Sequence, residues 1–203
     1  MGWQPLALAG ADLALWTDWV APAEADALLE ELRDTIAWET HVIRMFGREV
    51  ASPRLSCWIG DPGASYVYSR TRFEPRPWPP ALAALRPRLE QACGGTFNSV
   101  LANLYRDGRD AMGWHSDDEP ELGPAPVIAS LSLGASRRFL FRRKSPRSSA
   151  ALELELPHGS LLRMAGATQR LYQHALPRSA RVLTPRINLT FRHVLEGAPR
   201  AGA

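Results

Sequence analysis

The spacing of apolar residues predicts two helices in the first half of the chain. Residues 22–36 and 81–93 repeat apolar positions every three or four residues, which is the period of a helix with one buried face. A proline and acidic residues open the first segment, and two glycines follow the second. Pro87 should kink the second helix or mark a restart. Residues 1–20 show no clear period, and we expect them to form a packing arm.

Short β-like runs separated by turns make up most of the rest. In residues 40–68 these runs surround Met45-Phe46-Gly47-Arg48, which has the character of a hairpin tip. Beyond residue 96 we predict about eight strands without an intervening helix. They are residues 97–105, 113–115, 127–133, 138–142, 151–156, 160–164, 171–174 and 186–194.

This order of elements is typical of an antiparallel double-sheet barrel or jelly roll. We therefore predict a mainly β fold with flanking helices, folded as one compact domain. Residues 1–95 would form an N-terminal extension with the two helices, and residues 96–203 would form the jelly-roll core.

The strand predicted near the C-terminus alternates strictly between polar and apolar residues. Arg186, Asn188, Thr190 and Arg192 share one face, and three apolar residues share the other. An edge strand with a wet face is the simpler interpretation. If the polar face instead points into the barrel, its two guanidinium groups need an anion, because buried charge must be paired. A dicarboxylic acid would supply that anion, since arginine offers a bidentate fork to a carboxylate.

Composition narrows the class of protein only a little. The chain has 203 residues, 45% of them hydrophobic and 22% charged, with a formal net charge of +3, which is ordinary for a soluble globular protein. It has no long apolar run and no signal-like N-terminus, so we expect a soluble cytoplasmic protein. Its composition, rich in alanine, arginine and proline, suggests a bacterial type. Two cysteines do not suggest a disulfide framework or a cysteine-based zinc site.

A metal site is suggested by Trp114-His115-Ser116-Asp117-Asp118. In an extended segment His115 and Asp117 would point to the same face. Together they supply two thirds of the 2-His-1-carboxylate triad found in non-haem Fe(II) oxygenases. The third ligand should be a histidine on another strand. His174 is the best candidate because it lies in a β-like run, and His158, in a turn, is the second.

In their order along the chain, these motifs resemble the AlkB family of Fe(II)/2-oxoglutarate-dependent nucleic-acid dealkylases, most of all its branch that acts on duplex DNA. The resemblance rests on His115-Ser116-Asp117, His174, Asn103-x-Tyr105 and the segment from Arg186 to Arg192, and it covers about residues 46–194. It implies a double-stranded β-helix, with a nucleotide-recognition lid in the N-terminal extension.

The resemblance also implies a set of ligands. His115, Asp117 and His174 would bind Fe(II) and, together with Arg192, form the catalytic group. Arg186 would pair with the distal carboxylate of 2-oxoglutarate, aided by Tyr105. The remaining co-substrate contacts would come from Asn103, Asn188, Thr190 and Arg192. With O2, such a site would oxidatively demethylate N-alkylated bases such as 1-methyladenine and 3-methylcytosine in DNA and release formaldehyde.

Substrate contacts implied by the resemblance lie mainly in the N-terminal half. The base must leave the helix stack to reach the iron. Phe46 would then serve as a wedge and Arg48 as a phosphate contact, while Trp58 and Tyr68 would stack on the base or pack in the core. Asp118 would lie near a cationic methylated base. A basic stretch between Arg137 and Arg147 would bind phosphates beside the site.

Three alternatives remain open at this point. The same chemistry could act on RNA, including a tRNA wobble base, or on protein. A jelly roll could bind nucleic acid without catalysis, although an intact His–Asp–His set speaks against this. A zinc hydrolase using His115, His158 and His174 is the third, and it leaves the arginine strand without a purpose. The main prediction is a monomeric enzyme that repairs alkylated DNA, with RNA as the alternative partner.

Overall fold

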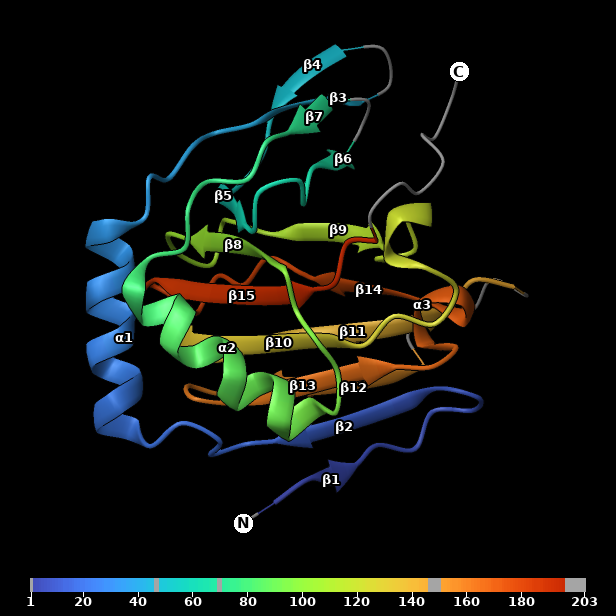
Figure 1. Ribbon diagram of the computed structural model, residues 1–203. Coiled ribbons are helices and arrows are strands. Elements are labelled where there is room, and N and C mark those ends of the chain that lie inside the picture. The colour runs from blue at the N-terminus through green and yellow to red at the C-terminus, as the bar shows by residue number, and fades with distance from the viewer. Residues whose placement is uncertain (1, 46–47, 69–70, 146–150, 196–203) are drawn as a thin grey trace.

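The protein folds into two antiparallel β-sheets that face one another, with helices on the outside (Figure 1). The computed structural model describes residues 2–45, 48–68, 71–145 and 151–195, and in residues 42–50 and 66–73 only the backbone. The predicted mainly β jelly-roll fold is confirmed, because strands dominate and their pairing within both sheets is antiparallel.

The major sheet contains seven strands and supplies one wall of the interior. In spatial order they are β1 (Gln4–Pro5), β2 (Asp12–Trp16), β13 (Leu161–Ala165), β10 (Ile128–Gly134), β15 (Arg186–Arg192), β8 (Ser99–Tyr105) and β5 (Leu55–Gly60). The polar–apolar alternation of β15 determines which face of this sheet packs against the helices and which faces the opposite sheet. Its apolar residues Ile187, Leu189 and Phe191 are buried beneath the helices, so its polar residues face the opposite sheet.

The minor sheet contains four strands and supplies the other wall. In spatial order they are β12 (Leu152–Leu156), β11 (Arg137–Arg143), β14 (Tyr172–Leu176) and β9 (Met112–His115). Apolar side chains from both sheets, such as Phe141, Leu156 and Leu162, form a core between them. Two further hairpins pair β3 (Val42–Met45) with β4 (Arg48–Ala51) and β6 (Tyr66–Tyr68) with β7 (Thr71–Phe73). Figure 1 shows both hairpins together, beyond β5 and β9.

Two long helices cover the outer face of the major sheet. Helix α1 (Pro22–Thr35) buries Ala25, Leu28 and Leu32, and helix α2 (Pro80–Cys93) buries an equivalent leucine stripe. Helix α2 continues through Pro87 without a restart. The proline is exposed on the solvent side, where a missing hydrogen bond and a ring disturb the helix least. A short helix α3 (Thr168–Leu171) and a 3-10 turn (Pro120–Leu122) complete the fold.

The N-terminal arm packs on the core as expected, and it also contains two strands that its sequence did not predict. Strands β1 and β2 pair with each other, and β2 extends the major sheet beside β13. Leu13 and Leu15 are buried and alternate with less buried positions in β2, so the strand pattern was present but short. Because β1, β2 and β5 all join the major sheet, residue 95 is no boundary within it. That residues 1–95 recognise the substrate and residues 96–203 carry the catalytic core stays a prediction about function.

Among the described residues, none of the helices has the length and the apolar character needed to span a lipid bilayer.

Candidate metal and co-substrate site

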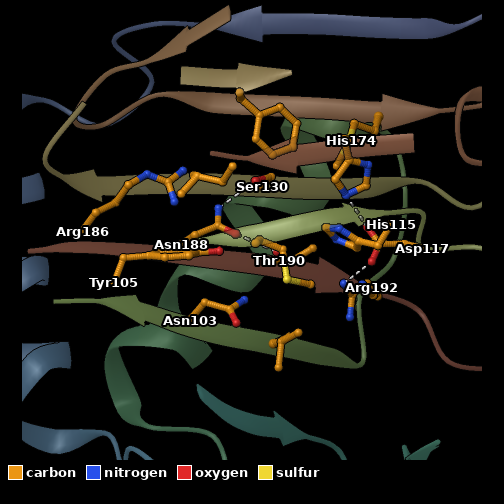
Figure 2. A pocket seen from close by; sticks show the side chains of 15 residues that line it. Asn103, Tyr105, His115, Asp117, Ser130, His174, Arg186, Asn188, Thr190 and Arg192 are labelled. Atoms are coloured by element: carbon orange, nitrogen blue, oxygen red, sulfur yellow. Dashed lines mark hydrogen bonds and ion pairs between the residues drawn. The ribbon is translucent and has the colours of Figure 1, made fainter. Parts of the chain in front are cut away.

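A cavity between the two sheets collects most of the polar residues singled out in the sequence (Figure 2). The polar face of β15 and the facing side of β8 form its floor, and β9 and β14 close it from the minor sheet. The structure brings together all nine residues predicted to bind metal or co-substrate. They are Asn103, Tyr105, His115, Asp117, His174, Arg186, Asn188, Thr190 and Arg192.

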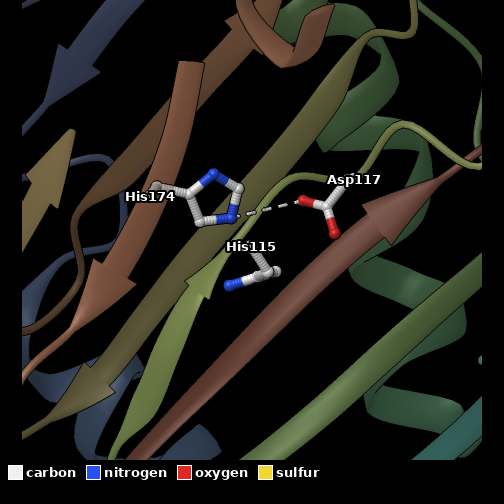
Figure 3. Close-up of side chains that lie close together, drawn as sticks. All are labelled: His115, Asp117 and His174. Atoms are coloured by element: carbon white, nitrogen blue, oxygen red, sulfur yellow. Dashed lines mark ion pairs between the residues drawn. The ribbon is translucent and has the colours of Figure 1, made fainter. Parts of the chain in front are cut away.

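The two histidines and the aspartate converge at one end of this cavity (Figure 3). His115 ends β9 and pairs directly across the strands with His174 of β14, while Asp117 follows two residues after His115. Potential ligand atoms of the three side chains all lie within 4.8 Å of one another. His174 Nε2 is 3.6 Å from Asp117 Oδ2. This is the arrangement a 2-His-1-carboxylate metal site requires.

Hydrogen bonds to the backbone hold the group in place. His115 Nδ1 lies 2.9 Å from the carbonyl oxygen of Gly113. Since that oxygen can only accept, Nδ1 carries the proton and Nε2 keeps a lone pair for a metal. The Asp117 backbone N–H donates to Gln169 Oε1 at 3.0 Å, and the Ser116 hydroxyl donates to the Tyr172 carbonyl at 2.9 Å. Gln169, on α3, carried no motif in the sequence.

The electrostatics of the group also favour a cation. Burial lowers the pKa of His174 to about 3, and desolvation likewise lowers the pKa of His115. Burial alone would raise the pKa of the Asp117 carboxyl, but Arg192 and the two histidines outweigh it and hold that pKa below its ordinary value. At neutral pH the group therefore offers two neutral imidazoles and one carboxylate, the protonation states that metals bind.

One carboxylate oxygen of the His–Asp–His group is buried without a hydrogen-bond partner among the described residues. Asp117 Oδ1 accepts from Arg192 Nη2, whereas Asp117 Oδ2 is buried and has no hydrogen-bond partner among the described residues. An unsatisfied carboxylate oxygen in the interior is costly. Since it faces two imidazoles, a divalent cation such as Fe(II) fits the donor set.

The opposite end of the cavity is positively charged. Arg186 is 1% exposed and donates through Nη2 to the Ser132 hydroxyl at 2.9 Å. Its Nε and Nη1 have no hydrogen-bond partner among the described residues, and burial lowers its pKa to about 10. The guanidinium lies 5.5 Å from the ring centre of Tyr105. A buried fork with free donors fits a carboxylate.

Neutral side chains line the floor between the two ends. The Asn188 amide donates to the Ser130 hydroxyl at 2.8 Å, and the Thr190 hydroxyl donates to Asn188 Oδ1 at 3.0 Å (Figure 2). On the neighbouring strand, Asn103 Oδ1 accepts from Arg54 Nε at 2.7 Å. No role was predicted for Arg54, Ser130 or Ser132. Arg54 lies outside every motif, and the two serines lie in the predicted strand 127–133.

The predicted substrate contacts have a mixed outcome. Phe46 lies outside the described residues, as do the side chains of Arg48 and Tyr68. The structure places Trp58 in the core rather than at the cavity. It is 4% exposed, packs with Leu122 and Val194 and donates to a backbone carbonyl, which corresponds to the packing alternative.

Asp118 lies next to the metal group but points to a different partner. Its carboxylate is half exposed and pairs with Lys144 Nζ at 2.6 Å. Lys144 also stands near enough to His174 to contribute to the lowered pKa of that imidazole. The carboxylate that was predicted to face a cationic base therefore forms an ion pair with a lysine.

Within the basic stretch predicted to bind phosphates, Arg137 is not available for that role. Arg137 is 1% exposed and donates to three backbone carbonyls, so it is a structural residue of two loops. Arg138 pairs with Glu153, and Arg142 stacks over Trp114 and donates to Gln173. Arg147 lies outside the described residues. These cations have protein partners that compete with a phosphate.

His158 is not a metal ligand with His115 and His174. Its Nδ1 accepts the backbone N–H of Gly134 at 2.7 Å, and its Nε2 lies 3.2 Å from an Asp26 oxygen. A zinc hydrolase built on these three histidines is therefore excluded.

Comparison with known proteins agrees with this geometry. Residues 12–192 match the profile of the 2OG-Fe(II) oxygenase superfamily. The human alpha-ketoglutarate-dependent dioxygenase alkB homolog 3 is 42% identical over 198 residues, which cover 92% of this chain and 68% of that protein. The human DNA oxidative demethylase ALKBH2 is 40% identical over 202 residues, covering 95% and 77%.

A solved structure supports the fold. The structure of OsALKBH1 superposes with a TM-score of 0.64, covering 94% of this chain and 99% of that one, at 18% sequence identity. At this identity the match concerns the arrangement of strands and helices alone.

Proposed function

Since this chain belongs to the 2OG-Fe(II) oxygenase superfamily, we propose that it is a dioxygenase that removes N-linked methyl groups from bases in DNA. The substrate class follows the names of its relatives, of which one is a DNA oxidative demethylase. One observation carries the proposal. A single cavity contains a cation-binding His–Asp–His group at one end and a buried arginine with free donors at the other. A dicarboxylate co-substrate that also touches iron would satisfy both.

Each residue has a definite task in this scheme. His115, Asp117 and His174 hold Fe(II), and Arg192 keeps Asp117 ionised and oriented. Arg186 binds the distal carboxylate of 2-oxoglutarate, with Tyr105 beneath its guanidinium. Asn103, Asn188 and Thr190 line the space between. Bound Fe(II) and 2-oxoglutarate supply the oxidising chemistry with O2.

The overall reaction balances with one co-substrate per methyl group. One oxygen atom of O2 enters the methyl group and the other enters succinate, while 2-oxoglutarate loses CO2. The hydroxymethyl group then leaves the base as formaldehyde when its C–N bond breaks. Bases such as 1-methyladenine and 3-methylcytosine carry a positive charge, so a carboxylate near the cavity favours them. Asp118, beside the metal group, is our candidate for that carboxylate, and the cationic base would then replace Lys144 as its partner.

The test is product analysis on defined oligonucleotides. Oligonucleotides that carry 1-methyladenine or 3-methylcytosine are incubated with Fe(II), 2-oxoglutarate and O2, and formaldehyde and succinate are measured. We expect both products in equal amounts, and neither from the His174→Ala variant. Succinate without formaldehyde from any methylated DNA, or formaldehyde from methylated RNA alone, would contradict the DNA assignment.

The form of the DNA is tested separately. We propose that Phe46 helps to extrude the base from a duplex and that the enzyme acts as a cytoplasmic monomer. A Phe46→Ala variant should lose activity on duplex DNA and keep activity on single strands. Equal activity of the variant and the wild type on both substrates would refute the wedge.

A further inference from the structure

Arg54 is a buried cation beside the cavity, and it lies in none of the sequence motifs. It directly precedes β5 and is 7% exposed. Its Nε donates to Asn103 Oδ1 at 2.7 Å, and its Nη1 donates to the Ser52 hydroxyl at 3.0 Å. Asn103 lines the cavity from β8, directly across from Asn188 of β15.

A purely structural role accounts poorly for the charge of Arg54. Both of its partners are neutral, and among the described residues no carboxylate pairs with it. Burying a guanidinium without a counter-ion is unfavourable. A neutral donor could tie β5 to β8 without this cost. An anion bound in the cavity beside Asn103 would compensate the charge of Arg54.

The bond to Arg54 also fixes which way the Asn103 amide faces. An asparagine side chain can be turned over, which exchanges its donor and acceptor ends. A guanidinium has only donors, so Asn103 must give it the oxygen. The two N–H groups of Asn103 Nδ2 are then left for the cavity, where no described residue accepts them. Two aligned donors backed by a positive charge form a site for an anion.

We propose that Arg54 is a positioning residue for the co-substrate: it holds the oxygen of the Asn103 amide and thereby presents the amide N–H groups, and a positive field, to a carboxylate of 2-oxoglutarate. This rests on the proposed use of 2-oxoglutarate. The dianion would then lie between two buried guanidinium groups, Arg186 in direct contact and Arg54 acting through Asn103.

The experiment measures binding without turnover. Calorimetry gives the affinity of each variant for 2-oxoglutarate in the presence of Mn(II), which replaces Fe(II) and does not support oxidation. Arg54→Met should weaken 2-oxoglutarate binding about tenfold or more. Arg54→Lys keeps the charge but not the fork, and it should fall between the wild type and Arg54→Met. Mn(II) affinity in the absence of 2-oxoglutarate should change little in either variant.

Arg163→Met is the matched control. Arg163 also loses two partners, the Cys93 carbonyl and Asp12, but it does not line the cavity. Its 2-oxoglutarate affinity should equal that of the wild type. If Arg54→Met unfolds, Arg54→Lys and an Asn103→Ala variant carry the test, with thermal melting to confirm that they fold.

A double-mutant cycle separates positioning from a direct contact. If Arg54 acts through Asn103, the double variant Arg54→Met/Asn103→Ala should bind 2-oxoglutarate about as well as Asn103→Ala alone. Additive losses would overturn the proposal, as would unchanged 2-oxoglutarate affinity with weakened binding of methylated oligonucleotides. If the wild type itself does not bind 2-oxoglutarate, the proposed function fails instead.

Discussion

At the residue scale, the cavity depends on charges that are only partly compensated by the protein itself. Asp117 is paired with Arg192 through one oxygen and is unsatisfied at the other. Arg186 makes one hydrogen bond to Ser132 and keeps two donor atoms without one. Both residues are nearly fully buried. The free protein therefore carries unfavourable interactions that a metal and a dianion would relieve.

Two substitutions at Asp117 should separate metal binding from stability. Asp117→Ala leaves Arg192 without its carboxylate and should cost about 3–5 kcal/mol in the free energy of unfolding. Asp117→Asn still accepts from Arg192 and should cost less, yet it removes the negative charge that a divalent cation needs. Urea unfolding and Mn(II) titration measure the two effects. Wild-type Mn(II) affinity in Asp117→Asn would show that the carboxylate is no ligand.

The buried histidines should make the metal-free protein sensitive to mild acid. The pKa of His174 is about 3 in the folded protein and about 6.5 in the unfolded chain. Below pH 6.5 the unfolded chain takes up a proton that the folded protein refuses, so stability falls as pH falls from about 6.5 towards 3. His115, whose pKa is also lowered, adds to the effect.

Urea unfolding at pH 7.5 and pH 5, without metal, measures this loss. The His174→Gln variant cannot protonate at this position, and its stability should change less between the two pH values. The same change in the variant and the wild type would mean that His174 is not the source.

Residues in periodic patterns could be predicted, and isolated ones could not. The polar face of β15 and the His–Asp pair at the end of β9 follow from spacing within single strands. Arg54 and Arg137 have no such pattern. Arg137 is buried because carbonyls of Asp107 and Asp110, in one turn, and of Pro177, far along the sequence, meet around it. Only the assembled fold distinguishes it from a surface arginine.

At the element scale, a loop is held closely against a turn near the charged end of the cavity. Ser179 donates its backbone N–H to the Gly108 carbonyl, and Gly108 donates its own to the Val182 carbonyl, each at 2.8 Å. A Cβ atom on Gly108 would lie 1.8 Å from the Ser179 carbonyl oxygen. That loop leads into β15 and therefore into Arg186.

Gly108→Ala should therefore push the loop away from the turn. We expect a loss of about 1–3 kcal/mol in stability, together with weaker 2-oxoglutarate binding as the start of β15 shifts. Gly113→Ala is the control, because nothing lies within 4 Å of a Cβ placed there. Thermal melting and calorimetry report the two quantities. A Gly108→Ala protein as stable as the control would show that the loop adapts freely.

Strand positions beyond residue 96 were predictable to within a few residues, whereas the N-terminal strands β1 and β2 were not. The interval 186–194 became β15 at Arg186–Arg192, and 127–133 became β10 at Ile128–Gly134. Strand β2 was missed because its pattern is only five residues long. Strand β2 pairs with β13, which lies far along the sequence, so its place could not be read from local spacing.

At the scale of the whole molecule, the core that stabilises the fold is separate from the cavity that would bind ligands. The outer helices and the apolar face of β15 form a core that needs no ligand. The inner faces of the two sheets enclose the cavity. Because the hairpins β3–β4 and β6–β7 stand apart from both layers (Figure 1), changes there should alter substrate selection more than stability.

The pairing of His115 with His174 has a kinetic consequence for the molecule. Strand β9 lies at the edge of the minor sheet, with β14 as its one neighbour in that sheet, and its register with β14 is irregular. A metal shared by the two histidines would act as a clasp across this seam. Amide protons of β9 should then exchange with deuterium slowly when Mn(II) is bound and quickly without it, while β15 exchanges slowly in both states. Equal exchange of β9 in both states would mean that the edge strand is held by its own hydrogen bonds and side chains.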